Sequence, residues 1–153
     1  AGYDKAMQAL VFDPLGMHDT TFDYAQAQTG NFARPHGYDI DHQVVVMDMG
    51  LNDTVRASRP AGAAWGTVND LLKYLQMEID LGKLPDGTRY IGEAALLQRR
   101  EPQIATGVDR NYAMALEVNR ADGVEVIDHG GDMGGFHSNM MWWPQQKVGE
   151  RHP

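Results

Sequence analysis

The sequence of 153 residues contains no cysteine. Disulfide bonds, thiolate metal sites and cysteine nucleophiles are therefore excluded, and the redox compartment is left open. No apolar run approaches the roughly 20 residues that a membrane helix needs, and residues 1–10 lack the pattern of a signal peptide. Serine is also scarce, with only Ser58 and Ser138 present. We therefore expect no membrane span and few candidates for a hydroxyl nucleophile.

Basic residues are outnumbered, because 13 Lys and Arg stand against 21 Asp and Glu and give a formal net charge of -8. Nucleic acids and anionic membranes are bound through clustered Lys and Arg that neutralise phosphates. We therefore expect no nucleic-acid partner and favour a small molecule or a peptide. The length and the hydrophobic content of 42% suit one domain, or a large part of one.

The first two thirds of the chain show helical patterns around an irregular segment. Residues 3–11 predict a helix that is stopped by residues 12–17, and residues 20–52 predict a long surface loop. The clearest helix begins at Thr67, with Asp70 three residues later as in a capping box, and ends at Gly82. Its predicted apolar face comprises Val68, Leu71, Leu72, Leu75 and Ile79. A second helix is predicted over residues 92–100.

After Pro102 the apolar pattern changes from helical to alternating, which is typical of β-strands. The candidate strands are residues 112–119, 124–128 and 136–143, with a hairpin turn at residues 121–123. The pattern predicts an α+β fold in which helices are followed by a short antiparallel sheet. We expect a single incomplete domain over residues 1–153, with a helical region over about 1–104 and antiparallel strands over about 110–144.

The stretch most suited to chemistry is residues 127–138, IDHGGDMGGFHS, which combines two histidines with four glycines. We expect His129 and Gly130 to lie where a strand runs into a bend that glycine permits. A glycine-rich connection between two strands also needs no function. Asp128, His129, Asp132 and His137 carry the ligand types of a zinc site, but their spacing matches no known ligand pattern. We therefore expect no metal and no cofactor, and keep a His/Asp metal site as an alternative.

Three blocks in this order resemble a known family. Residues 12–20, FDPLGMHDT, are similar to its PLGM segment, and residues 60–71, PAGAAWGTVNDL, to the start of one of its helices. Residues 112–138 resemble its closing strand motif through His129-Gly130-Gly131 and Gly135-Phe136-His137-Ser138. Together they resemble the C-terminal part of serine β-lactamase and penicillin-binding-protein superfamily hydrolases, on the class C β-lactamase, D-aminopeptidase and esterase side. The resemblance implies part of the β-lactamase/transpeptidase-like fold.

The resemblance implies serine acyl transfer with three motifs: Ser-x-x-Lys, Tyr-x-Asn, and Lys-Thr-Gly or His-x-Gly. Neither serine has lysine three residues later, and none of the six tyrosines has asparagine two residues later. Only the third motif is present. Because acyl transfer needs a nucleophile and a positioned base, we expect this chain to be a fragment that is inactive alone.

The resemblance also implies roles for the residues of the third motif. His129 would face the acyl site, Gly131 would keep the strand open to a substrate, and the Asp132 N–H would be one of two oxyanion donors. The expected substrate contacts are Gly130, His137 and Ser138. Since an imidazole binds carboxylate less firmly than a lysine, we favour peptidase or esterase use over β-lactamase use.

A non-catalytic module that binds a ligand or associates with itself is the other alternative. A short antiparallel sheet at a chain end leaves an edge that a second copy or a complementary fragment would cover. The expected partners are therefore the small-molecule or peptide substrate of the parent enzyme, a homo-oligomer partner or a complementary fragment. The resemblance permits a periplasmic or secreted location for the parent enzyme without fixing it.

Overall fold

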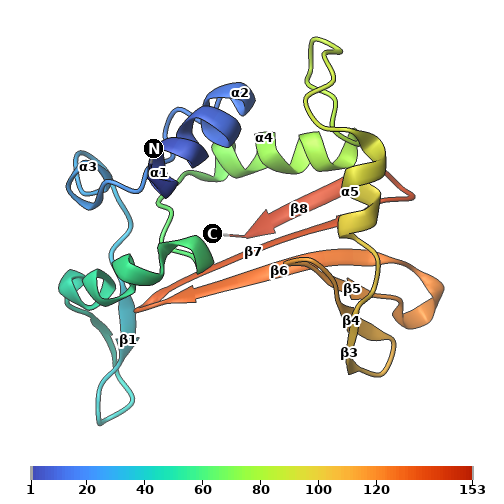
Figure 1. The fold of residues 1–153 in the computed structure, drawn as a ribbon. Coiled ribbons are helices and arrows are strands. Elements are labelled where there is room, and N and C mark those ends of the chain that lie inside the picture. Colours follow the sequence, from blue (N-terminus) through green and yellow to red (C-terminus); the bar gives the residue numbers. More distant parts are fainter. Residues whose placement is uncertain (1, 153) are drawn as a thin grey trace.

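A computed structural model describes residues 2–152, and it combines short helices with antiparallel sheets (Figure 1). The helices are α1 (Tyr3–Met7), α2 (Asp13–Leu15), α3 (Tyr24–Ala27), α4 (Val68–Ile79) and α5 (Glu93–Arg99), with a π turn η1 (Gln8–Phe12) and 3-10 segments η2 (Met49–Ala61) and η3 (Ala121–Gly123). The strands are β1 (His36–Tyr38), β2 (Val44–Val46), β3 (Ile104–Gly107), β4 (Arg110–Tyr112), β5 (Glu117–Asn119), β6 (Val126–Met133), β7 (Phe136–Trp143) and β8 (Val148–His152). The predicted α+β class is confirmed. No helix within residues 2–152 is long and apolar enough to span a bilayer.

The first helix continues beyond its predicted end. It runs from α1 through the π turn η1 into α2, and Gly16 ends it with a left-handed φ of 67°. Pro14 does not stop the helix, and the Leu10 carbonyl, which the N–H of residue 14 would bond in a regular helix, accepts a hydrogen bond from the Tyr90 hydroxyl instead. The helix therefore ends at Leu15, beyond the predicted end at residue 11 but within the predicted stop segment.

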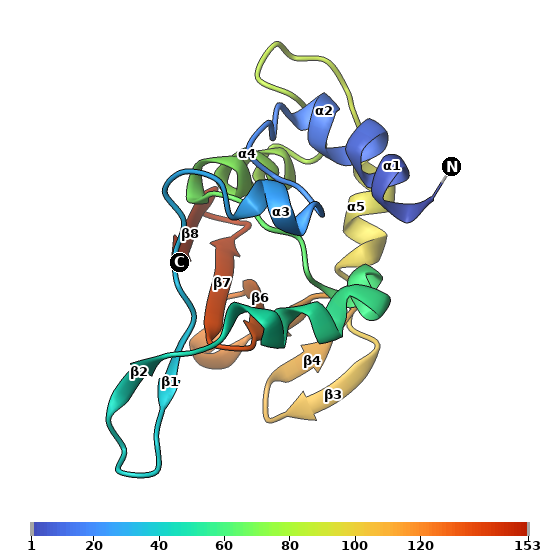
Figure 2. The ribbon, with the colours of Figure 1, turned by 90° about the vertical axis from the view of Figure 1, so that its left-hand side faces the viewer.

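The predicted loop over residues 20–52 contains regular structure. It holds the short helix α3 and a hairpin in which β1 pairs antiparallel with β2. Figures 1 and 2 show this hairpin projecting away from the other elements. Its apolar side chains are largely solvent-exposed: Tyr38, Ile40, Val44 and Val46. A two-stranded hairpin with exposed apolar residues has few contacts of its own to stabilise it.

Helix α4 begins as predicted and buries only part of its predicted apolar face. The Thr67 side chain accepts a hydrogen bond from the Asp70 N–H at 3.2 Å, which confirms the predicted N-cap. Leu75 is buried, whereas Val68 and Leu72 are exposed, so this part of the predicted apolar face is wrong. The buried positions of α4 instead include the carboxylates of Asp70 and Glu78. Both are tolerated in the interior because each has several hydrogen-bond donors.

Asp70 joins two of the sequence blocks that are far apart in the chain. Its carboxylate accepts hydrogen bonds from the Asp19 N–H and the Thr20 hydroxyl, both at 2.8 Å, and from the Lys73 ammonium at 2.9 Å. Lys73 also donates to the Gly16 carbonyl. Burial opposes ionisation of Asp70, but the bonds from Lys73, Thr20 and Asp19 outweigh it and lower the pKa of the carboxyl.

This lowered pKa predicts an acid-sensitive fold. The ionised Asp70 carboxylate stabilises the folded state in full above the unfolded pKa of about 3.9, and this contribution is lost as the pH falls through the lower folded-state pKa. We expect Asp70→Asn to lower the free energy of unfolding at pH 7 by roughly 1–3 kcal/mol and to reduce the acid dependence below about pH 4. Urea denaturation at a series of pH values measures both, with the exposed Asp19→Asn as the control. A variant with the wild-type acid profile would contradict the assignment.

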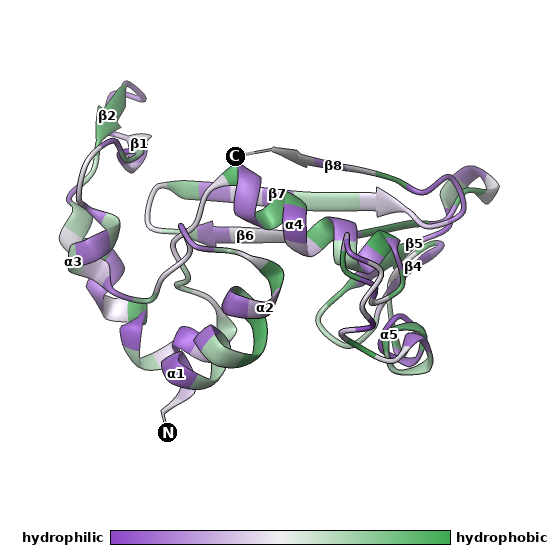
Figure 3. Ribbon diagram, turned by 90° about the horizontal axis from the view of Figure 1, so that it is seen from above, coloured by the Kyte–Doolittle hydropathy of each residue, from purple (hydrophilic) through white to green (hydrophobic). Residues whose placement is uncertain are grey.

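The main sheet has six antiparallel strands in the order β3 to β8, where three were predicted. The predicted strand over residues 112–119 is divided into β4 and β5 by a tight turn, in which Ala115 has φ 54°. Ile127 of β6 lies opposite Trp142 of β7, and both are fully buried against Leu75 of α4. Figure 3 shows α4 lying over β7, and α4 also contacts β8. The core of this part therefore lies between α4 and the sheet.

A buried charge cluster connects α4 to α5. Glu78 is fully buried and accepts hydrogen bonds from the Tyr74 hydroxyl at 2.7 Å, from Arg99, and from Arg100 at 2.8 Å. The Arg100 guanidinium also lies 5.4 Å from the centre of the Trp142 ring. Burial raises the pKa of Tyr74, so its hydroxyl stays protonated and donates to Glu78. We call Tyr74, Glu78, Arg99 and Arg100 the buried charge cluster.

Candidate functional site

The His-Gly-Gly-Asp motif lies within a strand. It was predicted to follow a strand that ends at Asp128, but β6 continues to Met133 and pairs with β7 along its whole length. The predicted bend at His129 and Gly130 is therefore wrong, and the chain turns later, at Gly134 and Gly135. The glycines at 130 and 131 leave the strand pattern intact because strong pairing with β7 compensates for their low strand propensity.

The far edge of β6 is open next to this motif. Strand β5 pairs with β6 only at residues 126–128, so residues 129–133 have no strand on that side among the described residues. An unpaired strand edge presents backbone N–H and C=O groups at alternate positions. Such an edge can bind an extended chain by adding a strand. The geometry therefore places a potential binding edge directly along the motif.

His129 is held by a tyrosine that the sequence analysis did not consider as a site residue. The Tyr112 hydroxyl of β4 lies 3.2 Å from Nε2 of His129, and the two ring centres are 6.1 Å apart. His129 is half-buried. Either group can donate in this contact: a Tyr112 hydroxyl that donates pairs with an imidazole protonated on Nδ1, and an imidazole protonated on Nε2 donates to the hydroxyl oxygen. The 17-residue separation gave no local sequence signal for this contact.

Asp132 and His137 lie on the opposite face of the sheet from His129. They are directly opposite in the β6–β7 register, and their side chains form an exposed ion pair when His137 is protonated. Because side chains alternate along a strand, Asp132 cannot reach the face that carries His129. Within residues 2–152 no group of three or more potential ligand side chains gathers around one point. The four residues of the alternative metal site therefore do not converge.

Gly131 lies opposite Ser138 in the sheet, and the approach is close. A Cβ atom at position 131 would lie 2.8 Å from Oγ of Ser138, so a side chain there would displace the hydroxyl. Ser138 is exposed and, like Ser58 in η2, hydrogen-bonds no base among the described residues. Neither serine is therefore activated as a nucleophile in this arrangement.

The turn between β6 and β7 is fixed by segments from the first half of the chain. The His36 N–H donates to the Gly135 carbonyl at 3.0 Å, and Asn52 Nδ2 donates to the Gly134 carbonyl at 3.2 Å. The rings of Trp65 and Phe136 meet edge to face at 5.1 Å. Gly135 has φ 84° and would clash with His36 if it carried a Cβ, so glycine is required there. The position of the turn therefore depends on contacts with His36, Asn52 and Trp65 as well as on its own glycines.

One arginine bridges two carboxylates next to the site. Arg110 of β4 donates to Glu117 of β5 at 3.0 Å and to Asp128 of β6 at 3.4 Å. Burial raises the pKa of the Asp128 carboxyl, and the negative charge of Glu117 raises it further. The positive charge of Arg110 lowers this pKa but does not cancel the rise. This cross-strand group stabilises the short strands that support the open edge.

Comparison with known proteins relates this arrangement to a family. The family model described as Beta-lactamase matches residues 1–149. Penicillin-binding protein 4 of Amycolatopsis lactamdurans is 29% identical over 156 aligned residues, which cover 95% of this chain and 39% of that protein. The chain thus spans well under half the length of this curated relative.

Two solved structures have the same fold. The octameric penicillin-binding protein homologue from Pyrococcus abyssi matches with a TM-score of 0.81 and 19% identity, over 97% of this chain and 32% of that one. The β-lactamase/D-alanine carboxypeptidase from Pseudomonas syringae matches with a TM-score of 0.69 and 17% identity, over 97% of this chain and 47% of that one. These likenesses confirm the predicted β-lactamase/transpeptidase-like fold. The chain belongs to the beta-lactamase family.

Proposed function

We propose that this chain supplies the strand side of a serine acyl-transfer site, and that the nucleophile and the base come from a segment outside residues 1–153. The observation that carries the proposal is the open edge of β6 along residues 129–133, with His129 held beside it by Tyr112. Family membership supports the reaction type. In this proposal residues 1–153 form a single incomplete domain and are inactive alone.

The residues of the motif take distinct roles in the proposal. The imidazole of His129 hydrogen-bonds the catalytic tyrosine of the missing segment or a carboxylate of the substrate. The N–H of Asp132 is one donor to the oxyanion, and Gly131 leaves room for the substrate backbone. Gly130 and Ser138 line the path of the bound substrate along the strand, whereas the predicted contact from His137 is dropped because its side chain lies on the other face of the sheet. With histidine in place of lysine, an ester or a D-amino-acid peptide is favoured as substrate over a β-lactam.

The proposal is tested by covalent labelling. The 153-residue chain is incubated with a fluorophosphonate and, separately, with a penicillin, and its intact mass is measured alongside turnover of a chromogenic ester. We expect neither an adduct nor turnover until the complementary segment is supplied, after which the label attaches to that segment. A stoichiometric adduct on Ser58 or Ser138 would overturn the proposed division of the site.

A second candidate function is self-association, which the β1–β2 hairpin favours. Ile40 is 94% exposed and Tyr38 is 75% exposed, and such apolar surface is commonly covered in an assembly. The homologue from Pyrococcus abyssi is octameric. We expect the sedimentation coefficient to rise with protein concentration, and Ile40→Lys to abolish the rise, while Asp41→Lys has little effect. Concentration-independent sedimentation of the wild type would exclude this role.

A further inference from the structure

The open edge of β6 carries an exposed acidic side chain near its end. Asp132 is the second-last residue of the strand, and its side chain is 80% exposed. Gly130, two residues earlier on the same face, has no side chain that could cover the carboxylate. The carboxylate therefore stands in solvent beside a stretch of backbone that pairs with no strand on that side among residues 2–152.

One oxygen of this carboxylate is held from the β7 side. Nδ1 of His137, which lies directly opposite in the register, hydrogen-bonds Oδ1 of Asp132. Oδ2 of Asp132 has no hydrogen-bond partner among the described residues. A neutral imidazole that donates from Nδ1 leaves the carboxylate its negative charge. His137 therefore orients Asp132 and leaves Oδ2 for a donor that approaches from the open edge.

The nearby basic side chain on the same face is already paired. Arg110 bridges Glu117 and Asp128, at 3.0 Å and 3.4 Å. Two carboxylates stand against one guanidinium, so this group keeps a negative charge, and Asp132 adds a second one farther along β6. We call this side of the sheet, which carries Asp128 and Asp132, the outer face. Its charge favours a positive group in a chain that pairs with the open edge.

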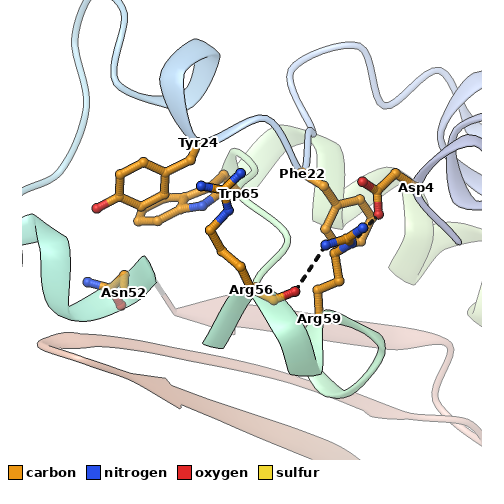
Figure 4. A pocket seen from close by; sticks show the side chains of 8 residues that line it. Asp4, Phe22, Tyr24, Asn52, Arg56, Arg59 and Trp65 are labelled. Carbon is orange, nitrogen blue, oxygen red and sulfur yellow. Dashed lines mark hydrogen bonds and ion pairs between the residues drawn. The ribbon is translucent and has the colours of Figure 1, made fainter. Parts of the chain in front are cut away.

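The turn that follows Asp132 is held by other elements, so the acidic end of the edge has a fixed position. Asn52 Nδ2 donates to the Gly134 carbonyl at 3.2 Å, and the Trp65 ring meets the Phe136 ring at 5.1 Å. Figure 4 shows Asn52 and Trp65 in the wall of a cavity of about 120 Å³ next to the strands. An edge that is ordered in advance loses less conformational entropy when it binds a chain.

We propose that Asp132 selects a substrate whose residue opposite it carries a positive charge, such as the ammonium group of a lysine side chain. Directly opposite residues of paired strands place their side chains on the same face, with Cβ atoms roughly 4.5–5.5 Å apart. The cationic side chain therefore lies on the outer face and pairs with Oδ2 of Asp132, away from His129 and the acyl centre. This inference rests on the proposed function, because it takes the open edge of β6 as the binding edge, and it names the chemical class of the bound peptide or ester.

The experiment is an NMR titration of the ¹⁵N-labelled chain with the peptides acetyl-Val-X-Val-amide, in which X is Lys, Gln or Glu. Each peptide is made in the L and the D form, and the charge preference is measured in the form that binds more tightly. The titration is run at about pH 8, where histidine side chains are mostly neutral. Dissociation constants come from the amide shifts of residues 130–133.

We expect the Lys peptide to bind about two- to fivefold more tightly than the Gln peptide, and the Glu peptide to bind more weakly by a similar factor. In about 1 M salt these differences should shrink, because the screening length falls to about 3 Å.

Variants assign the preference to Asp132. Asp132→Asn keeps an oxygen for His137 and removes the charge, so we expect the three peptides to bind alike. Asp41→Asn changes an exposed carboxylate in the distant β1–β2 hairpin and should keep the wild-type preference. Equal binding of the three peptides to the wild type, or an unchanged preference in Asp132→Asn, would overturn this inference and leave the binding edge intact. No shift at residues 130–133 with any peptide would overturn both the inference and the role of the edge in the proposed function.

Discussion

Replacing Glu78 by leucine is expected to lower the free energy of unfolding by roughly 3–5 kcal/mol, because it leaves the charges of Arg99 and Arg100 buried without a carboxylate. Glu78 is fully buried and Arg100 is 8% exposed, so water cannot replace the lost partner without opening the contact between α4 and α5. A loss of this size is a large fraction of the stability of a small domain. Chemical denaturation monitored by tryptophan fluorescence measures it.

Matched variants separate charge from shape in this cluster. Glu78→Gln keeps the size of the side chain and an acceptor for Tyr74, so we expect a smaller loss than with leucine. Glu101→Gln changes an exposed carboxylate near the end of α5 and is expected to stay within about 0.5 kcal/mol of the wild type. If Glu78→Leu were as stable as Glu101→Gln, the buried charge cluster would be irrelevant to folding.

His129→Ala is expected to lower the rate of acyl transfer in the complete active site by about 10²-fold or more, the lower range for a group that positions or transfers a proton. The imidazole lies beside the open edge of β6, 3.2 Å from the Tyr112 hydroxyl. In the proposed site, His129 is the one titratable side chain that residues 1–153 contribute at the acyl centre, and His129→Ala removes it. The measurement is ester turnover after the complementary segment has been supplied.

Tyr112→Phe tests whether the tyrosine acts through His129. It removes one hydroxyl and keeps the ring, so we expect roughly a five- to tenfold fall in rate with little loss of stability. In the double variant with His129→Ala the tyrosine change should have no further effect, because its partner is gone. Tyr38→Phe removes an exposed hydroxyl from the distant hairpin and serves as the control. Additive effects of the two changes would show that Tyr112 acts independently.

The sequence predicted those elements whose signals are local. Thr67 and Asp70 marked the start of α4, residues 92–100 contained α5, and residues 136–143 formed β7 within the predicted bounds. Capping residues and strand alternation depend on neighbours a few positions away, so they are visible in one sequence. The order of the three blocks was enough to predict the family.

Features that depend on distant residues were missed. The burial of Asp70 and Glu78 follows from donors about 20 to 50 positions away, and a helical pattern assigns such carboxylates to the surface. The strands β3 and β8 were missed because each is short or polar and exists through pairing with a neighbour. The contact of Tyr112 with His129 likewise appears only once the sheet is assembled.

The anchoring of the β1–β2 hairpin has a consequence for how much this chain can vary. Its base is fixed to the β6–β7 turn by the hydrogen bond from the His36 N–H to the Gly135 carbonyl, and it is closed by the hydrogen bond from the Met47 N–H to the Pro35 carbonyl at 2.9 Å. Everything beyond these bonds projects into solvent, where doubling the length of a loop costs only about 0.6 kcal/mol. The segment between residues 38 and 44 is therefore a natural position for insertions or for exchange with another peptide. A reporter sequence placed there should leave the open edge of β6 undisturbed.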